Sequence, residues 1–302
     1  MQFIVEAQDN GKLVRDYLKK QGISAALLSK LKRHEQGILL NDTRVTVRAL
    51  LHTGDVLTLA IEDEWGNEKI LPLAKEVETV CETEDFVAIN KPPFMPTHPS
   101  HGHFDDTLAN ALVWRYGACF RPRFINRLDR NTSGLVLVAK HHLSATKLAR
   151  AMAAGEIKKV YYAVACGIIE GETVLKTGIR RQKESVLTRE VCAVDEGDLA
   201  ITHITPLATN GKRTLLRLAP ETGRTHQLRV HAAYLGAPLV GDEFYGTPDA
   251  DFPRHALHAA AMTFPHPVTG ERMTLTAPLA PDMADLIEKE FGKEALLLVK
   301  NT

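Results

Sequence analysis

The sequence NRLDRNTSGLVLVAK occupies residues 126–140 and joins a dense polar turn to an apolar strand. Asp129 stands between Arg127 and Arg130, and a carboxylate flanked by opposite charge is expected to stay ionised. An ionised aspartate can act as a nucleophile or as a base. Asp, Asn, Ser and Gly are also the usual residues of a simple polar turn, so these residues alone leave both interpretations open.

A second dense polar segment, PETGRTHQLRVHAAYLG, spans residues 220–236. A turn is predicted at its glycine, and Thr225 is expected to cap a helix near 225–235. A helix of this composition can bury one side and direct Arg229 into a cleft, where it would meet Asp129 if the fold joins the two segments. An ordinary surface helix is equally consistent with these residues.

Outward from these two segments, strands and helices mix without strict alternation. Strands are predicted at 86–89, 135–140, 160–167, 214–220 and 272–278, and helices near 144–154 and from Pro281 onward. This mixture favours an α+β domain over a parallel βαβ array. We therefore predict an α+β domain with a largely antiparallel mixed sheet.

The N-terminal region, residues 1–61, predicts a separate small α/β module. Residues 12–21 and 24–34 have the spacing of amphipathic helices, and Ser24 is expected to cap the second. GILLNDTRVTV then predicts a hairpin with its turn at Asn41-Asp42. Two helices and a few short strands are enough for a compact module of this size.

Charge is uneven along the chain. Residues 1–61 carry nine Lys or Arg and six Asp or Glu, which is nine minus six or +3, whereas the whole chain is neutral. A basic front end fits a module that contacts phosphates, although a solvated helix face has the same composition. The side chains expected to contact RNA phosphates are Lys19, Lys20, Lys30, Lys32 and Arg33. A polar stretch then predicts a linker, which divides the chain into 1–62, a linker at 63–79 and a larger domain at 80–302.

Metal and nucleotide cofactors are not expected. Histidines gather in a Pro-rich stretch at 89–107 and again in RHALHAAAMTF, but zinc sites usually add a second ligand pair at a characteristic spacing. The residues interpreted instead as loop or sheet residues are His98, His101, His103, Asp105, His255 and His258. Neither GxxxxGK[ST] nor GxGxxG occurs, so nucleotide cofactors find no support.

Composition indicates an ordinary globular protein. The 302 residues are 44% hydrophobic and 25% charged, and no apolar run approaches the roughly 20 residues that cross a bilayer. The first residues do not have the pattern of a signal peptide. The four cysteines form no CxxC pair, so we expect them to be reduced and the protein to be cytoplasmic.

Four segments, in order, resemble the RluA family of pseudouridine synthases from about Val80 to about Pro278. The most specific is RLDR at 127–130 followed by TSG, and the second is GRTHQLRVH at 223–231 followed by GAPLVGDEFYG. INKPP and the KVYYA segment are weaker members. The front module resembles the RNA-binding fold of ribosomal protein S-four, a common attachment in this family.

The resemblance implies site-specific isomerisation of uridine to pseudouridine in a structured RNA, by base flipping and an aspartate-dependent mechanism without a cofactor. It favours large-subunit ribosomal RNA ahead of transfer RNA as the partner, and a monomeric protein away from membranes. It makes Asp129 the catalytic residue and Arg229 its partner, in a planar two-point contact. Tyr161 would stack on the target base and help remove the proton from its carbon 5. The implied substrate contacts are Arg127, which fills the gap left by the flipped base, Leu228, which lines the uracil pocket, and Arg130 and Thr132.

Two positions depart from the family pattern HRLDRDTSGL. Asn126 replaces the His and Asn131 replaces the second Asp, so loop geometry or substrate contacts can differ although the catalytic position is intact. The family chemistry leaves open whether the aspartate attacks the ribose, attacks the base or removes a ribose proton. Two other functions remain: a non-catalytic RNA-binding or ribosome-assembly factor, and a glycosidase that releases the base.

Overall fold

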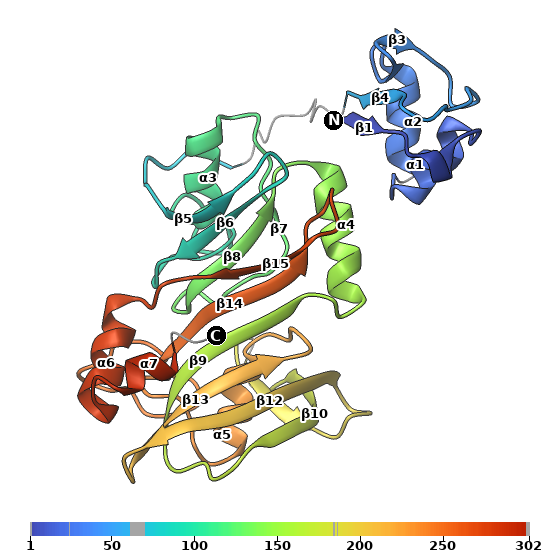
Figure 1. Ribbon diagram of the computed structural model, residues 1–302. Helices are drawn as coiled ribbons and strands as arrows, with labels where there is room; N and C mark the ends of the chain where they lie inside the picture. The colour runs from blue at the N-terminus through green and yellow to red at the C-terminus, as the bar shows by residue number, and fades with distance from the viewer. Residues whose placement is uncertain (1, 24, 61–69, 184, 186, 300–302) are drawn as a thin grey trace.

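The computed structural model describes residues 2–23, 25–60, 70–183, 185 and 187–299, apart from the side chains of residues 26, 27 and 30 (Figure 1). The expected helix cap Ser24 and much of the expected linker therefore lie outside the described residues. The described elements build a small four-stranded sheet and a large eleven-stranded sheet. Within these ranges, no helix combines the length and apolar character that crossing a bilayer requires.

The small sheet belongs to a unit at the front of the chain. Its elements are β1 (Gln2–Ile4), the 3-10 turn η1 (Ala7–Asp9), α1 (Val14–Lys20), α2 (Ala25–Arg33), β2 (Ile38–Leu40), β3 (Thr43–Arg44) and β4 (Val56–Leu59). The strands pair antiparallel in the order β1-β4-β2-β3. The predicted hairpin is confirmed, because β2 pairs with β3 and φ is 48° at Asn41 and 63° at Asp42, as a type I′ turn requires.

The large sheet runs through the rest of the molecule. Its strands are β5 (Glu78–Glu82), β6 (Phe86–Lys91), β7 (Arg123–Phe124), β8 (Ser133–Ala139), β9 (Lys158–Cys166), β10 (Thr173–Arg181), β11 (Arg189–Cys192), β12 (Asp198–Thr209), β13 (Arg213–Pro220), β14 (Leu257–Pro265) and β15 (Arg272–Thr276). The helices are α3 (Leu108–Tyr116), α4 (His142–Ala153), α5 (Gln227–Tyr234), α6 (Pro281–Phe291) and α7 (Ala295–Leu298).

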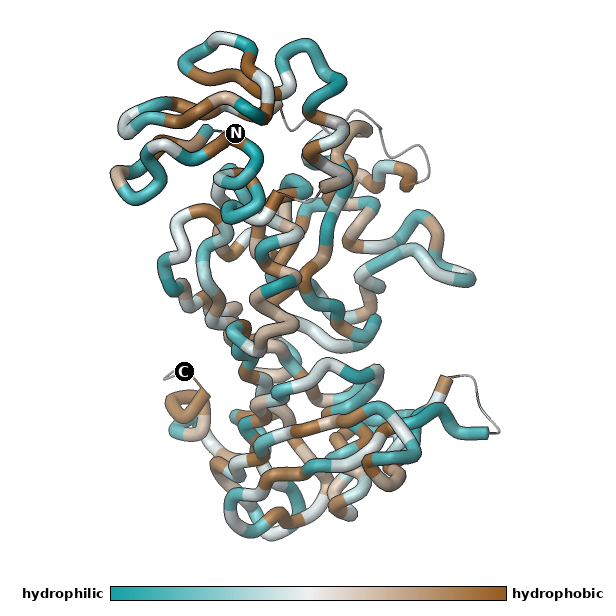
Figure 2. Tube along the Cα trace, turned by 90° about the vertical axis from the view of Figure 1, so that its right-hand side faces the viewer, coloured by the Kyte–Doolittle hydropathy of each residue, from teal (hydrophilic) through white to brown (hydrophobic). Residues whose placement is uncertain are grey.

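The strand pairing confirms an α+β fold with a largely antiparallel mixed sheet. The main path is β11-β10-β12-β13-β9-β14-β8-β6-β5, with β15 on β14 and β7 on β8. Among the described strands, every pairing is antiparallel except that of β8 with β14. Figure 2 shows that the outlying loops are mostly hydrophilic, whereas the interior strands include long hydrophobic stretches.

Strand β8 is buried on both faces and separates two cores. Val136 and Val138 point into a core that also contains Tyr161 and Leu228, whereas Leu137 faces the core that α4 covers. A strand covered on both faces needs apolar residues at every position, and SGLVLVA is of this kind. The sheet therefore keeps α4 on the face opposite Tyr161 and Leu228.

The small unit packs against α4. Leu143, near the start of α4, is fully buried in the small unit's own apolar core. Gly22 lies against the side chains of Lys147 and Arg150 on the same helix. The small unit thus contacts the helix that covers the face of the large sheet opposite Tyr161.

Three helices differ from the sequence predictions. Helix α5 begins at Gln227, and its N-cap residue is His226. The predicted cap at Thr225 is therefore wrong, because the left-handed residue in front of the helix, with φ 57°, is His226. Helix α3 was not predicted, although Thr107 and Asn110 form a capping box in front of its apolar residues. Helix α6 does begin at Pro281, as predicted, but the short α7 follows it.

Candidate active site

The turn that carries Asp129 lies between β7 and β8. Thr132 N–H donates to the Asp129 carbonyl at 3.1 Å, which closes the turn. Gly134 follows at φ 109°, and a Cβ there would lie 2.2 Å from the carbonyl oxygen of Ala259 on β14. Only glycine lets β8 and β14 approach this closely, so the glycine of the TSG motif is required by the sheet.

The RHALH segment supports the turn from within the protein. His255 Nε2 lies 2.7 Å from Thr132 Oγ1, and His258 Nδ1 lies 3.0 Å from Ser133 Oγ. Burial lowers the pKa of both histidines, that of His258 to about 4, so both stay neutral at pH 7. Thr132 was expected to contact the substrate, but its hydroxyl is buried and engaged by His255. This geometry favours a supporting role for Thr132.

The opposite side of the turn is held by a buried lysine from the INKPP segment. Lys91 Nζ donates to the carbonyls of Pro92 and Met95 at 2.8 Å each and to that of Arg130 at 3.1 Å. Burial is the main cause that lowers the pKa of Lys91, to about 7. The lysine thereby ties the segment after β6 to the catalytic turn.

Asn126, one of the two departures from the family pattern, is a structural residue. Its amide nitrogen donates to the Leu135 carbonyl at 3.0 Å, and its amide oxygen accepts from Leu137 N–H at 2.9 Å. A side-chain amide supplies both a donor and an acceptor, which is what this stretch of β8 backbone requires. The departure is therefore accommodated inside the protein rather than at the Asp129 carboxylate.

Arg229 of α5 links the two polar segments that the sequence singled out. Its Nη1 lies 3.3 Å from Asp129 Oδ2, whereas Nε and Nη2 donate to the two carboxylate oxygens of Asp242 at 2.7 and 2.6 Å. The expected two-point contact with Asp129 is therefore wrong: that contact is made with Asp242, and Asp129 receives a single contact. Burial acts to lower the pKa of Arg229, but the pairs with Asp242 and Asp129 outweigh it and raise that pKa.

Asp242 was not singled out, although it lies in the GAPLVGDEFYG segment of the resemblance. It is completely buried, and its Oδ1 also accepts from the backbone N–H groups of Phe244 and Tyr245 at 3.0 and 3.2 Å. A buried carboxylate held by two amides is a rigid acceptor. Asp242 therefore fixes the guanidinium of Arg229 in front of Asp129.

His226 is a second residue at the carboxylate without a predicted role. Its Nε2 lies 3.7 Å from Asp129 Oδ2, and its Nδ1 lies 2.8 Å from the hydroxyl of Tyr245. That hydroxyl accepts from Arg189 N–H at 2.8 Å, so its own proton can be donated to Nδ1. The tautomer assigned by this network carries its proton on Nε2, on the side of Asp129. Burial lowers the pKa of His226.

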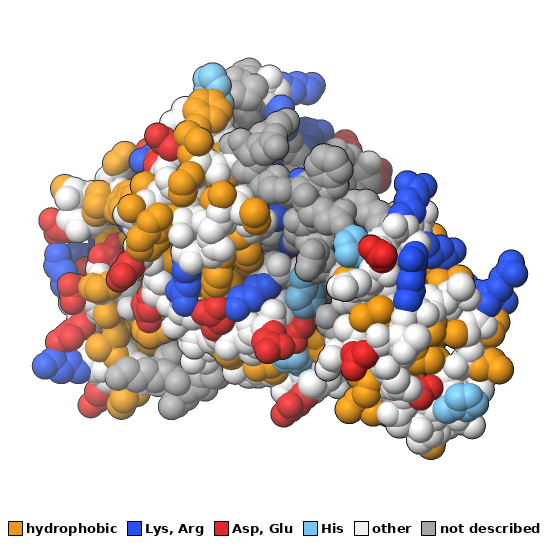
Figure 3. Space-filling view, turned by 90° about the horizontal axis from the view of Figure 1, so that it is seen from above, with side chains coloured by type: hydrophobic (Ala, Val, Ile, Leu, Met, Phe, Trp, Pro, Cys, Tyr) orange, Lys and Arg blue, Asp and Glu red, His pale blue; other side chains and the backbone are white. Residues whose placement is uncertain are grey.

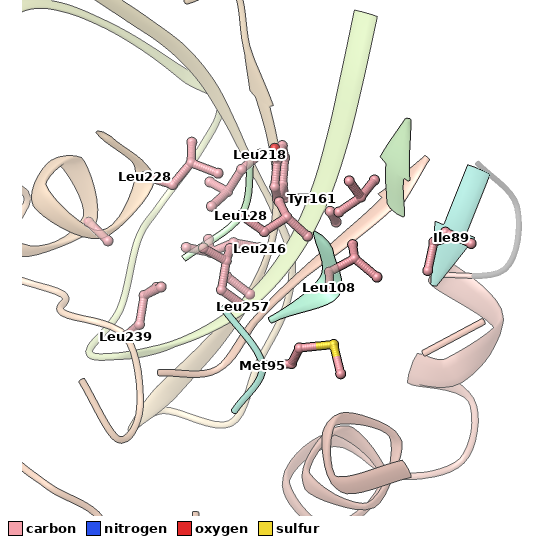
Figure 4. Close-up of a cluster of buried hydrophobic side chains, with 14 of the residues drawn as sticks. Ile89, Met95, Leu108, Leu128, Tyr161, Leu216, Leu218, Leu228, Leu239 and Leu257 are labelled. Atoms are coloured by element: carbon pink, nitrogen blue, oxygen red, sulfur yellow. The ribbon is translucent and has the colours of Figure 1, made fainter. Parts of the chain in front are cut away.

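Apolar side chains form the wall next to the carboxylate. Figure 4 shows Tyr161 beside Leu128, with Leu228 in the same cluster. Burial is the first cause that raises the pKa of Tyr161, and the nearby Asp129 raises it further. The phenol therefore stays protonated at neutral pH. The Asp129 side chain is 30% exposed, so a partly open carboxylate lies over an apolar wall.

The predicted basic residues lie away from the Asp129 carboxylate. Arg127 and Arg130 are exposed, and the side chains at the carboxylate are the Arg229 guanidinium at 3.3 Å and the His226 imidazole at 3.7 Å. On the small unit, Lys19, Lys20, Lys32 and Arg33 are exposed, whereas the Lys30 side chain lies outside the described residues. Lys20 is partly engaged, because its Nζ lies 2.7 Å from Asp9 Oδ1. Figure 3 shows Lys and Arg side chains projecting from the small unit's side of the molecule.

Comparisons with known proteins agree with this arrangement. The sequence pattern described as RNA pseudouridylate synthase matches residues 85–234. The uncharacterized RNA pseudouridine synthase YjbO of Bacillus subtilis (strain 168) is 36% identical over 281 residues, which cover 92% of this chain and 99% of that protein. Ribosomal large subunit pseudouridine synthase D of Pseudomonas aeruginosa (strain PAO1) is 35% identical over 289 residues, covering 88% of this chain and 89% of that protein.

A solved structure supports the same assignment. Human RNA Pseudouridylate Synthase Domain Containing 1 superposes with a TM-score of 0.59 and 26% identity, covering 75% of this chain and 96% of that one. The matched region 85–234 contains the Asp129 turn and α5, which meet at the carboxylate. The chain therefore belongs to the RluA family of RNA pseudouridine synthases.

Proposed function

We propose that this enzyme isomerises a specific uridine of large-subunit ribosomal RNA, with Asp129 as the catalytic residue. The observation that carries the proposal is the partly open Asp129 carboxylate, held by Arg229 beside the apolar wall of Tyr161 and Leu228. In the reaction the bond from uracil nitrogen 1 to ribose carbon 1 breaks and a bond from carbon 5 forms. Carbon 5 loses a proton and nitrogen 1 gains one, so atoms and electrons balance without an oxidant.

The target base must leave its stack before Asp129 can reach it. Enzymes that act on a base in structured RNA extrude the nucleotide into a fitted pocket. Arg127 is exposed on the catalytic turn and is proposed to fill the gap that the base leaves. Arg130, also exposed on this turn, is proposed to contact the substrate. Leu228 and Tyr161 would hold the detached uracil and exclude water while it turns.

The surroundings of Tyr161 favour one of its two expected roles. A phenol whose pKa is raised by burial and by a neighbouring carboxylate is a poor base. We assign to Tyr161 the stacking contact with the base. Removal of the carbon 5 proton then falls to another group, and the Asp129 carboxylate is the nearest candidate. Arg229 would hold that carboxylate in position.

The small unit is proposed to bind RNA in the manner of the ribosomal protein S-four fold. Its exposed Lys19, Lys32 and Arg33 supply positive charge, and it packs on α4, away from Asp129. We propose the division into a module at 1–62, a linker at 63–79 and a catalytic domain at 80–302. In this arrangement the module adds affinity for the RNA, and the protein acts as a cytoplasmic monomer.

The experiment that tests the proposal maps pseudouridine in total RNA from cells with and without this protein. One or a few uridines of large-subunit ribosomal RNA should lose the modification, and the gene should restore it. A gene encoding Asp129→Asn should not restore it, although that variant should still bind RNA, because Asn keeps the shape but not the charge. Loss of the modification in transfer RNA instead would show that transfer RNA, and not ribosomal RNA, is the substrate. Restoration by Asp129→Asn would remove Asp129 from the chemistry.

A further inference from the structure

Phe94 combines a strained backbone with an exposed aromatic ring. Its φ is 62°, in the left-handed region that bulky side chains rarely adopt, and 46% of the residue is exposed. Four non-glycine residues of the described chain have positive φ. Asn41 and Asp42 form the hairpin turn, where such residues are usual, whereas Phe94 and His226 both lie at the candidate active site.

The protein holds Phe94 in this conformation from both sides. Lys91 Nζ binds the carbonyls of Pro92 and Met95 at 2.8 Å, one before and one after the strained residue. Met95 is buried in the same core as Tyr161. With both flanks fixed, the backbone turns the Phe94 ring outward instead of into that core.

The segment that carries Phe94 adjoins the active site. The ammonium of Lys91 also binds the carbonyl of Arg130 at 3.1 Å, so the turn at Phe94 sits directly against the catalytic turn. Three residues further on, Thr97 Oγ1 donates to the Leu128 carbonyl at 2.9 Å and keeps the two segments together. Phe94 thus lies on a segment that is bonded to both sides of the turn that carries Asp129.

We propose that Phe94 is a stacking platform for an unpaired base of the RNA substrate, next to the uridine that enters the site. The inference rests on the proposed function, and it names a base contact that the catalytic residues do not supply. Arg127 and Arg130 are exposed on the adjoining catalytic turn, and their charge favours the phosphates of a nucleic acid over an apolar protein partner. Bases of unpaired nucleotides stack on exposed aromatic rings whatever their sequence.

If Phe94 served only to form the turn, a residue that tolerates the left-handed region would suit the position better. Asn tolerates the left-handed region and would make the same turn with less strain. Phe94→Asn should therefore leave the melting temperature unchanged or raise it. Under our proposal the same change lowers RNA affinity, because it removes the ring.

The test measures the dissociation constant for a large-subunit ribosomal RNA transcript and the single-turnover rate of pseudouridine formation. Phe94→Asn and Phe94→Leu remove the ring, the second while keeping its apolar bulk, and Phe94→Tyr keeps it. The matched control is Trp114→Ala on α3, an aromatic residue that is 45% exposed beside Arg115, which binds Glu82 on the edge strand β5.

Both ring-removing variants should bind the transcript about 5- to 150-fold more weakly, the range for one base stacked on one ring. Phe94→Tyr and Trp114→Ala should bind as the wild type does. Unchanged affinity in Phe94→Leu, or a slower reaction at unchanged affinity in both variants, would overturn the inference. If the wild type forms no pseudouridine in any RNA, the proposed function fails, and the binding measurements still decide the role of Phe94.

Discussion

Replacing Asp242 with Asn should destabilise the catalytic domain strongly, because Asp242 is the main partner of a buried arginine. The carboxylate is fully buried and accepts from Arg229 at 2.7 and 2.6 Å and from two backbone amides. Asn keeps the volume but replaces one acceptor oxygen by a donor and removes the charge. Breaking a buried ion pair from one side costs about 3–5 kcal/mol. Since domains are stable by about 5–15 kcal/mol, the loss is a large share of the total.

The same substitution should slow the reaction in the molecules that stay folded. Arg229 would lose one of the two contacts that fix its plane, together with the charge of its partner, and keep the 3.3 Å contact with Asp129. Its guanidinium should then shift toward that carboxylate and displace it from its reactive position. A displacement of about 1 Å can cost about 100-fold in rate, and we expect a loss of that order at saturating RNA.

The assay is urea unfolding followed by circular dichroism, together with single-turnover rates measured at a temperature where the variant is folded. The matched control is Asp251→Asn, which breaks the pair between Asp251 and Lys289 at 2.8 Å on the surface, where the two side chains are 74% and 60% exposed. That change should leave the free energy of unfolding and the rate nearly unchanged, because exposed ion pairs are screened by solvent and contribute little. If Asp242→Asn lowers the free energy of unfolding by no more than this control does, the two contacts between Asp242 and Arg229 do not hold the site together, and the prediction is wrong.

Three further predictions concern other parts of the molecule. His258 has a folded-state pKa of about 4 against 6.5 in the unfolded chain, so the unfolded state takes up protons first, and stability that is complete above pH 6.5 is lost toward pH 4. In His258→Asn, the free energy of unfolding lost between pH 6.5 and pH 4 should be smaller by about 3 kcal/mol. Urea titrations at several pH values measure this loss, and an unchanged dependence of stability on pH would contradict the prediction. Gly134→Ala should lower the free energy of unfolding by about 3 kcal/mol or more, because its Cβ would collide with the Ala259 carbonyl. The control Gly155→Ala has open space around the new Cβ and should cost only about 1–3 kcal/mol of backbone strain. Equal losses of stability on thermal unfolding would refute the close approach of β8 and β14. Removing residues 1–65 should weaken RNA binding and flatten the slope of log affinity against log salt by roughly 0.7–0.9 per lost phosphate contact, with little change in maximal rate; a lower maximal rate with an unchanged slope would instead mean that the module shapes the site.

Much of the fold was predictable because it depends on local patterns. The apolar run of β8, the Asn41-Asp42 turn and the proline that starts α6 each follow from residues that are close together in the chain. The family resemblance rested on the same kind of information, since its motifs are short and contiguous. It identified the RNA pseudouridine synthase family and the two segments that meet at Asp129.

The partners inside the site were decided by the tertiary structure alone. No spacing rule connects Arg229 to Asp242 in preference to Asp129, because a guanidinium binds whichever carboxylate the fold places in its plane. The supporting bond of His255 to Thr132 joins residues that are 123 positions apart. Sequence determines which side chains can donate, accept or carry charge, but chain folding decides which of them share a buried space, and there the direction and length of each contact determine what it does.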